Sequence, residues 1–211
     1  MLDDPGFEAV GDHGLGKWQV RYALKTSEPT SRPRWKVVPR VDKDPARGKY
    51  LSVEESAPAA GTVFIGQRVR LPNELPLLEL AVDFQTYCAT PGRSGSVAIA
   101  VFSVETWDSV STDPDTAAPP SEGALFRHVL HPNGEKVTEW HRGRVPPAEL
   151  QRGLAPLAGR EVVVALDWNT WHPAANEWAR FDSFYLGEPR PNVEAAAWPR
   201  WAYTGEPLRL T

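Results

Sequence analysis

The sequence predicts an all-β fold: a two-sheet antiparallel β-sandwich of the jelly-roll type, with about ten strands and little helix. Two observations support this fold class. Apolar and polar residues alternate with a period of two in segment after segment, and the 21 prolines break helices and mark the loops between these segments. The best helix candidate, Pro147–Leu154, is short, starting with proline and carrying Gly153 near its end.

The clearest alternation covers residues 77–87. It places apolar side chains on one face and Asp83, Gln85 and Tyr87 on the opposite face. Residues 97–104 are apolar on both faces, which is typical of a central strand. The remaining strands are expected at residues 18–24, 35–40, 50–54, 62–71, 125–130, 160–168 and 178–186. Turn signals between so many short strands favour two packed sheets.

The composition bounds the functions that the chain can have. Hydrophobic residues make up 41% and charged residues 24%, as in ordinary globular proteins, and the net charge is −4. This charge offers no footprint for nucleic acid or for anionic membranes. No segment approaches the roughly 20 apolar residues of a membrane span, and no signal peptide is visible. Cys88 is the only cysteine, so an internal disulfide is excluded and a core position is expected.

The length of 211 residues suits one domain with an extension. We expect the domain at residues 1–188. Residues 189–211 change in character and are expected to form a linker or the start of a following domain, with Trp198 and Trp201 packing on that neighbour. The long polar, proline-bearing run within residues 103–123 predicts a functional or mobile loop.

Four short segments resemble the motifs of one family. Residues 4–8 read Asp-Pro-Gly-Phe-Glu, residues 44–53 form a turn entering a strand, residues 67–72 read Gln-Arg-Val-Arg-Leu-Pro, and residues 178–186 contain Phe-Asp-Ser-Phe-Tyr-Leu. In this order they resemble carbohydrate-binding modules with the galactose-binding-like jelly roll. The resemblance implies a polysaccharide or glycan ligand, a secreted or extracellular location, and attachment to a glycan-active enzyme with a neighbouring catalytic domain.

The same resemblance implies a structural calcium ion between Glu8 and Asp182, with carbonyls from the turn around Arg47 and Lys49. Ser183 stands where many relatives carry a second aspartate, which lowers the charge of this site. The alternative is that Glu8 and Asp182 are ordinary carboxylates at strand ends.

Signals for catalysis are few. Residues 92–96 read Gly-Arg-Ser-Gly-Ser, which misses the nucleophile elbow at its last position. His128 and His131 are three residues apart on an expected strand, so they face opposite sides and do not suggest a shared zinc. The loop after residue 166 offers Asp167, His172 and Glu177 as acids or bases.

The nine tryptophans divide by their expected location. Those within predicted strands are expected to pack in the core or on a sheet face; they are Trp18, Trp35, Trp168 and Trp178. Those in predicted loops or at strand ends are candidates for stacking on sugar rings; they are Trp107, Trp140 and Trp171.

The predicted ligand site combines two strands. Alternation sends Asp167 and Asn169 away from the apolar face of their strand, as it does Asp83, Gln85 and Tyr87. If both strands belong to one sheet, these five side chains form one exposed polar surface, with Trp171 at its rim. The alternative is an ordinary solvated sheet face.

Three functions therefore remain open. The first is a non-catalytic carbohydrate-binding module, and the second is a structural spacer that binds no glycan. The third is a small jelly-roll polysaccharide lyase or hydrolase, although the sequence favours a protein that is not an enzyme.

Overall fold

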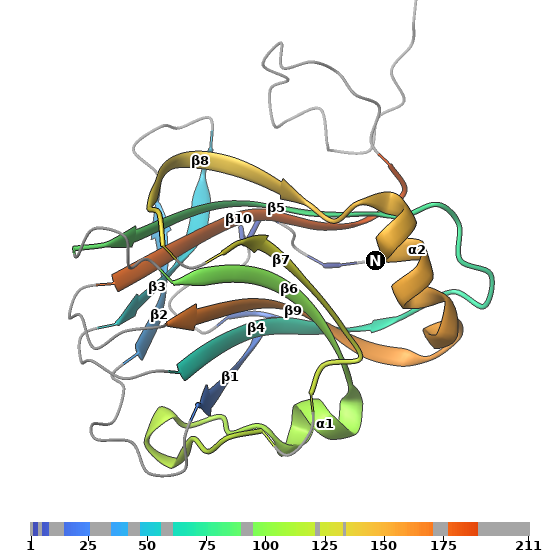
Figure 1. Cartoon of the computed structure of the whole chain (residues 1–211), viewed down its shortest axis with the longest axis horizontal. Coiled ribbons are helices and arrows are strands. Elements are labelled where there is room, and N and C mark those ends of the chain that lie inside the picture. The colour runs from blue at the N-terminus through green and yellow to red at the C-terminus, as the bar shows by residue number, and fades with distance from the viewer. Residues whose placement is uncertain are drawn as a thin grey trace, which may run out of the picture.

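The protein is described by a computed structural model, which covers residues 2–3, 6–8, 15–25, 35–41, 47–55, 61–89, 95–120, 123–132, 134–170 and 177–189. Two five-stranded antiparallel sheets lie face to face (Figure 1), which confirms the predicted β-sandwich. The first sheet has the order β1-β4-β9-β6-β7 and the second β2-β3-β10-β5-β8.

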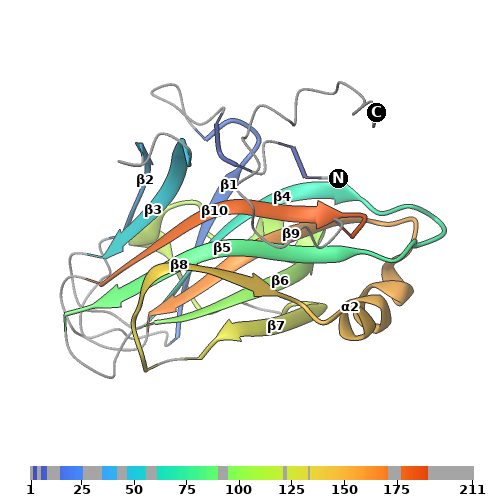
Figure 2. The same cartoon turned by 90° about the horizontal axis from the view of Figure 1, so that it is seen from above.

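The first sheet consists of β1 (Gln19–Leu24), β4 (Gly61–Arg70), β9 (Glu161–Thr170), β6 (Ser96–Ser103) and β7 (Phe126–His131). The second sheet consists of β2 (Trp35–Val41), β3 (Lys49–Glu55), β10 (Glu177–Gly187), β5 (Glu79–Cys88) and β8 (Val137–Arg144). All neighbouring strands pair antiparallel. Figure 2 views the molecule with the second sheet in front of the first.

The predicted helix is confirmed as α2 (Pro147–Leu154), and all nine predicted strands are present. The sequence did not predict β8, which pairs with β5 and stands at the edge of the second sheet among the described strands. Nor did it predict α1 (Val104–Ser109), whose first turn is capped by the Ser103 hydroxyl accepting from the Thr106 amide at 3.1 Å.

The main core lies between the sheets and is built from the alternating apolar residues. Leu80, Val82 and Phe84 of β5 are fully buried there, as are Val164 and Leu166 of β9. Each such side chain contributes about 1.5–3 kcal/mol when removed from water. The period-two pattern of the sequence is therefore the pattern of side chains that enter this core.

A second, smaller core lies on the outer face of the first sheet, beneath α1. Trp107 is fully buried there against Phe64 and Phe102. Gly66 makes room for the indole, because a Cβ atom at this position would lie 2.9 Å from it. The single long loop expected within residues 103–123 is corrected here: α1 and the 3₁₀ turn Pro114–Thr116 interrupt it, and Trp107 of α1 belongs to the second core. The outer face of the second sheet has no such helix over it (Figure 1) in the part of the chain that the structure describes.

None of the helices formed by the described residues is long and apolar enough to span a membrane.

Candidate functional site

Four aromatic side chains gather on the outer face of the second sheet: Tyr50 from β3, Tyr87 from β5, Trp140 from β8 and Trp178 from β10. Tyr87 is paired directly with Trp178 across β5 and β10, so both side chains lie on the same face. This face points away from the core because the alternate residues of the same strands point into it. We call the surface formed by these four residues the aromatic face.

The four rings form two contacting pairs. Tyr87 stacks on Trp178 with ring centroids 5.4 Å apart. Tyr50 meets Trp140 edge to face at 5.5 Å, although their strands β3 and β8 are separated by β10 and β5. Trp140 and Tyr50 therefore lean over the intervening strands. Tyr87, Trp140 and Trp178 are half-buried, so each keeps part of its ring accessible to a ligand.

Arg180 of β10 lies between the two pairs. Its guanidinium carbon is 4.2 Å from the ring centre of Trp178 and 5.4 Å from that of Tyr50. Its Nη1 donates to the Gln85 Oε1 atom at 3.3 Å, and the Gln85 amide in turn donates to the carbonyl of Thr138 at 2.9 Å. Gln85 is itself buried, so its role in this arrangement is to hold Arg180 in place.

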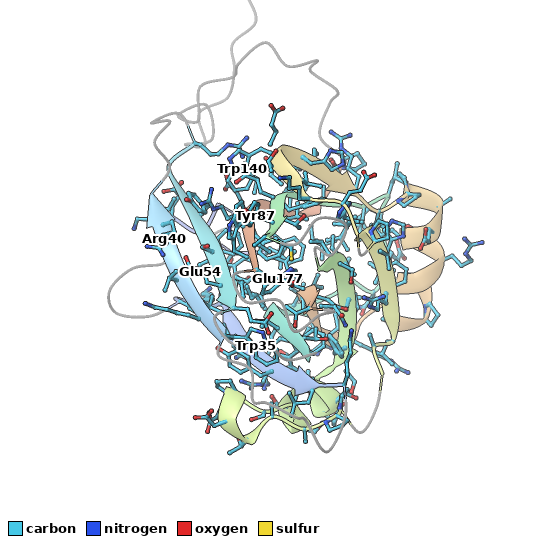
Figure 3. All side chains as sticks on the ribbon, turned by 60° about the vertical axis from the view of Figure 1, so that its left-hand side comes forward. Trp35, Arg40, Glu54, Tyr87, Trp140 and Glu177 are labelled. Carbon is cyan, nitrogen blue, oxygen red and sulfur yellow. The ribbon has the colours of Figure 1, made fainter. Side chains whose placement is uncertain are left out.

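Polar side chains continue the face over β2 and β3. Arg40 and Glu54 form an ion pair of 2.6 Å, and the Ser52 hydroxyl donates to the same Glu54 oxygen at 3.3 Å. Figure 3 shows Arg40 and Glu54 over the blue strands β2 and β3, on the same side of the view as Tyr87 and Trp140. The face thus combines ring surfaces with charged hydrogen-bonding groups.

Arg47 connects the aromatic face with the ends of the strands. Its guanidinium lies 4.4 Å from the ring centre of Trp140. The same group binds Asp83 at 3.3 Å and the fully buried Asp182 at 3.2 Å. Arg142 of β8 also binds Asp83, at 3.0 Å. Arg47 therefore neutralises a buried carboxylate and fixes the position of an indole at the same time.

The expected calcium site can be tested against these contacts. Glu8 and Asp182 do lie together, since a Cβ atom at Gly6 would be 3.8 Å from one carboxylate and 3.9 Å from the other. However, Arg47 occupies one Asp182 oxygen, and the Lys49 ammonium binds the Glu8 carbonyl at 3.0 Å. In the described residues no group of three or more His, Cys, Asp or Glu side chains is arranged to hold a metal. These residues, as arranged, do not fit a calcium ion.

The predicted site is brought together only in part. Asp83, Gln85, Tyr87 and Trp140 lie on the outer face of the second sheet. Trp171 lies outside the described residues.

The prediction that Asp167 and Asn169 join this surface is wrong, because their strand β9 belongs to the first sheet. Asp167 is buried and binds Arg127 at 2.6 Å, and Asn169 donates to Thr62 at 3.0 Å. Burial raises the pKa of Asp167, and Arg127 and Lys25 oppose this effect.

The prediction that Trp107 contacts a ligand is also wrong. Its indole is fully buried in the second core, and its Nε1 donates to Gln19 at 2.7 Å. Of the tryptophans expected to pack inside, Trp18, Trp35 and Trp168 are buried in the main core.

Sequence reasoning missed Tyr50, Trp178 and Arg180 as site residues. A signal was available: period-two alternation in β10 places Trp178, Arg180 and Asp182 on one face, opposite the buried Phe181. The pairing of β10 with β5, which brings this row beside Gln85, is not visible in the sequence.

Two of the groups suggested for catalysis, Asp167 and Glu177, are buried and do not belong to the aromatic face. Glu177 starts β10, points into the molecule and pairs directly with Glu55 of β3 and Cys88 of β5. Burial raises the pKa of Glu177 to about 7, and Cys88 and Lys25 oppose this effect. His172 lies outside the described residues, so the structure does not test the three acids as a group.

No protein-family model matches the sequence, and no curated protein does. Similar solved structures include a family 61 carbohydrate-binding module in complex with β-1,4-galactotriose, at 16% identity over 89% of this chain and 97% of that chain, with a TM-score of 0.46. A carbohydrate-binding module of the β-sandwich superfamily matches at 11% identity over 87% of this chain and 60% of that chain, with a TM-score of 0.48. The family 11 module of a cellulosomal cellulase from Clostridium thermocellum matches at 10% identity over 85% and 96% of the two chains, with a TM-score of 0.41. All three are carbohydrate-binding modules, with identities to this chain of 10–16% and TM-scores of 0.41–0.48.

Proposed function

We propose that this chain is a non-catalytic carbohydrate-binding module and that its glycan ligand lies on the aromatic face. One observation carries the proposal: Tyr87, Trp140 and Trp178 are half-exposed together on one sheet face, whereas the other tryptophans that the structure describes are buried in the two cores; they are Trp18, Trp35, Trp107 and Trp168. Aromatic rings gathered on an open surface are typical of binding sites. The C–H face of a pyranose ring supplies the apolar area that such rings can cover.

The polar groups of this face suit the same ligand. Sugar hydroxyls both donate and accept hydrogen bonds. Arg40 carries donors and Glu54 carries acceptors on this face. Each of the carboxylates on this face is bound to an arginine side chain, as Asp83 is to Arg142 and Asp182 is to Arg47. We infer that these carboxylates hold the face in shape and take no part in acid–base chemistry.

The resemblance of residues 4–8, 44–53, 67–72 and 178–186 to carbohydrate-binding modules supports the same function. In such a role the chain is an accessory domain of a secreted glycan-active enzyme. The composition of residues 189–211 supports a connection to a neighbouring domain.

Affinity gel electrophoresis against a panel of neutral and acidic polysaccharides tests the proposal. We expect retardation by at least one polysaccharide, and a roughly tenfold loss of affinity in Trp140→Ala and Trp178→Ala, by analogy with stacking on other flat rings. Leu77→Ala is the matched control, because Leu77 is an exposed apolar residue outside the aromatic face. Unchanged affinity in both tryptophan variants would place the ligand elsewhere, and binding to no polysaccharide would favour the structural spacer.

A further inference from the structure

The aromatic face carries more positive charge than its own carboxylates neutralise. The inference drawn from this surplus rests on the proposed function and makes its ligand more specific. We infer that the glycan ligand is acidic, a polysaccharide that contains uronic acids, and that Arg180 binds one of its carboxylates.

Arg180 is a guanidinium without a carboxylate partner among the described residues. It is held in place by the rings of Trp178 and Tyr50 and by one hydrogen bond to Gln85. Its Nε atom is buried without a hydrogen-bond partner in the described part of the chain. A guanidinium in this setting has given up water without gaining an anion, so a carboxylate that reaches it forms a strong charge-assisted hydrogen bond.

Cations and pairs of aromatic rings alternate across the face. The Lys136 ammonium lies 5.5 Å from the ring centre of Tyr87, and Tyr87 stacks on Trp178. The guanidinium of Arg180 lies on the ring of Trp178. The row continues beyond Arg180 through Tyr50 and Trp140 to Arg47. A polyuronate repeats a carboxylate along its chain, and a row of separated cations is complementary to that repeat.

The charges of the face do not balance. Register and ring contacts place seven cations on it: Lys36, Arg40, Arg47, Lys136, Arg142, Arg144 and Arg180. The same contacts place four carboxylates there: Glu54, Glu79, Asp83 and Asp182. The arginines at 40, 47, 142 and 144 bind these carboxylates, whereas Lys36, Lys136 and Arg180 form no ion pair within the described residues. This surplus of positive charge stands on a chain whose net charge is −4.

A matched pair of ligands tests the inference. Polygalacturonate and its carboxyl-reduced form share a backbone and differ only at C6, which carries a carboxylate in the first and a hydroxymethyl group in the second. Alginate adds a second uronate backbone. By isothermal titration calorimetry we expect at least one uronate polymer to bind about tenfold or more tightly than its reduced form. We also expect this preference to shrink as sodium chloride is raised from about 50 to about 500 mM.

Variants of the aromatic face then identify the residues that cause the preference for the uronate polymer over its reduced form. Arg180→Gln should abolish it while leaving residual binding to the reduced polymer, and Arg180→Lys should retain only part of it because lysine lacks the guanidinium fork. Lys36→Gln provides a second test that does not disturb packing, since Lys36 is exposed. Arg70→Gln is the control, because it removes an exposed charge from β4 of the first sheet.

Three results would overturn the inference. Equal binding of the uronate and reduced polymers would exclude an acidic ligand while leaving the carbohydrate-binding function intact. A preference that survives Arg180→Gln and Lys36→Gln would place the carboxylate elsewhere. Binding to none of these polymers would overturn the inference, whereas only the wider panel of neutral and acidic polysaccharides decides on the carbohydrate-binding function.

Discussion

Tyr87 and Trp178 stack with their ring planes 13° apart, from directly paired positions on β5 and β10. This contact joins β10, the central strand of the second sheet, to β5 on the aromatic face. It is thus a part of the proposed site that also contributes to the stability of the sheet.

A double-mutant cycle measures that contribution. Tyr87→Ala and Trp178→Ala should each lower the free energy of unfolding, and the double variant should lose less than the sum of the two. We expect a coupling energy of about 0.5–1.5 kcal/mol in urea unfolding, because stacked aromatic pairs add this much beyond their buried area. Additive losses would mean that the two rings do not interact in solution.

We expect substitution of Trp107 to affect stability and not glycan affinity, the opposite of what we expect for Trp140. Trp107→Ala should destabilise the fold by about 3–5 kcal/mol, since it empties the second core, and should leave glycan affinity per folded molecule unchanged. Gly66→Ala should cost about 1–3 kcal/mol, because its Cβ atom would press on the same indole. Loss of binding in a folded Trp107 variant would contradict this assignment.

Glu177 predicts a pH dependence of stability. Its pKa in the folded protein is raised from 4.5 to about 7, so the folded state binds more protons than the unfolded state between these values. The contribution of protonated Glu177 to the free energy of unfolding is therefore fully present below about pH 4.5 and is lost as the pH rises through about 7.

The variant Glu177→Gln isolates this effect. It should be more stable than the wild type at pH 8, by on the order of 1–3 kcal/mol, since one pKa unit corresponds to about 1.4 kcal/mol, and less dependent on pH between about 4.5 and about 7. Glu161→Gln is the control, because Glu161 is exposed at the start of β9. Parallel pH profiles of the wild type and Glu177→Gln, measured by chemical denaturation, would argue against a raised pKa at this residue.

Neutralisation of Asp182 by Arg47 and neutralisation by a calcium ion lead to opposite expectations for how the melting temperature responds to EDTA. Because Arg47 already binds the buried Asp182, we expect EDTA and millimolar calcium to leave the melting temperature of the wild type unchanged. Arg47→Ala should lose on the order of 2–3 kcal/mol, since it leaves that carboxylate without its cation, and added calcium should restore part of the loss. A wild-type melting temperature that falls in EDTA and recovers with calcium would instead establish the metal that the sequence predicts.

The elements that sequence could predict are those with one buried face. β5 and β9 showed their core-facing residues through alternation, and the outward direction of Asp83 and Asp167 was predicted correctly. The placement of Asp83 and Asp167 on one surface was predicted wrongly. Alternation indicates which side of its strand a residue occupies, but it leaves open which strands share a sheet. That choice depends on long-range pairing, such as Phe84 with Phe181, which has no local signal.

β8 shows a second limit of sequence reasoning. It is an edge strand in which Glu139 and His141 are exposed as well as Thr138, so its residues carry no apolar period. Trp140 was therefore expected in a loop or at a strand end, although the prediction of a ligand contact still selected it. The prediction for Trp107 was wrong for a related reason. Its short helix is polar apart from Val104, and burial of the indole depends on the space left by Gly66.

The cover formed by α1 over the first sheet has a kinetic consequence. β9 and β6 lie near the middle of that sheet, with the main core on one side and the second core on the other. Their amide hydrogens should exchange with deuterium only when the whole molecule unfolds, whereas those of the edge strands β2 and β8 should exchange through local opening. A glycan bound across the second sheet would then slow exchange at those edges and leave the amides of β9 and β6 at the rate set by global unfolding.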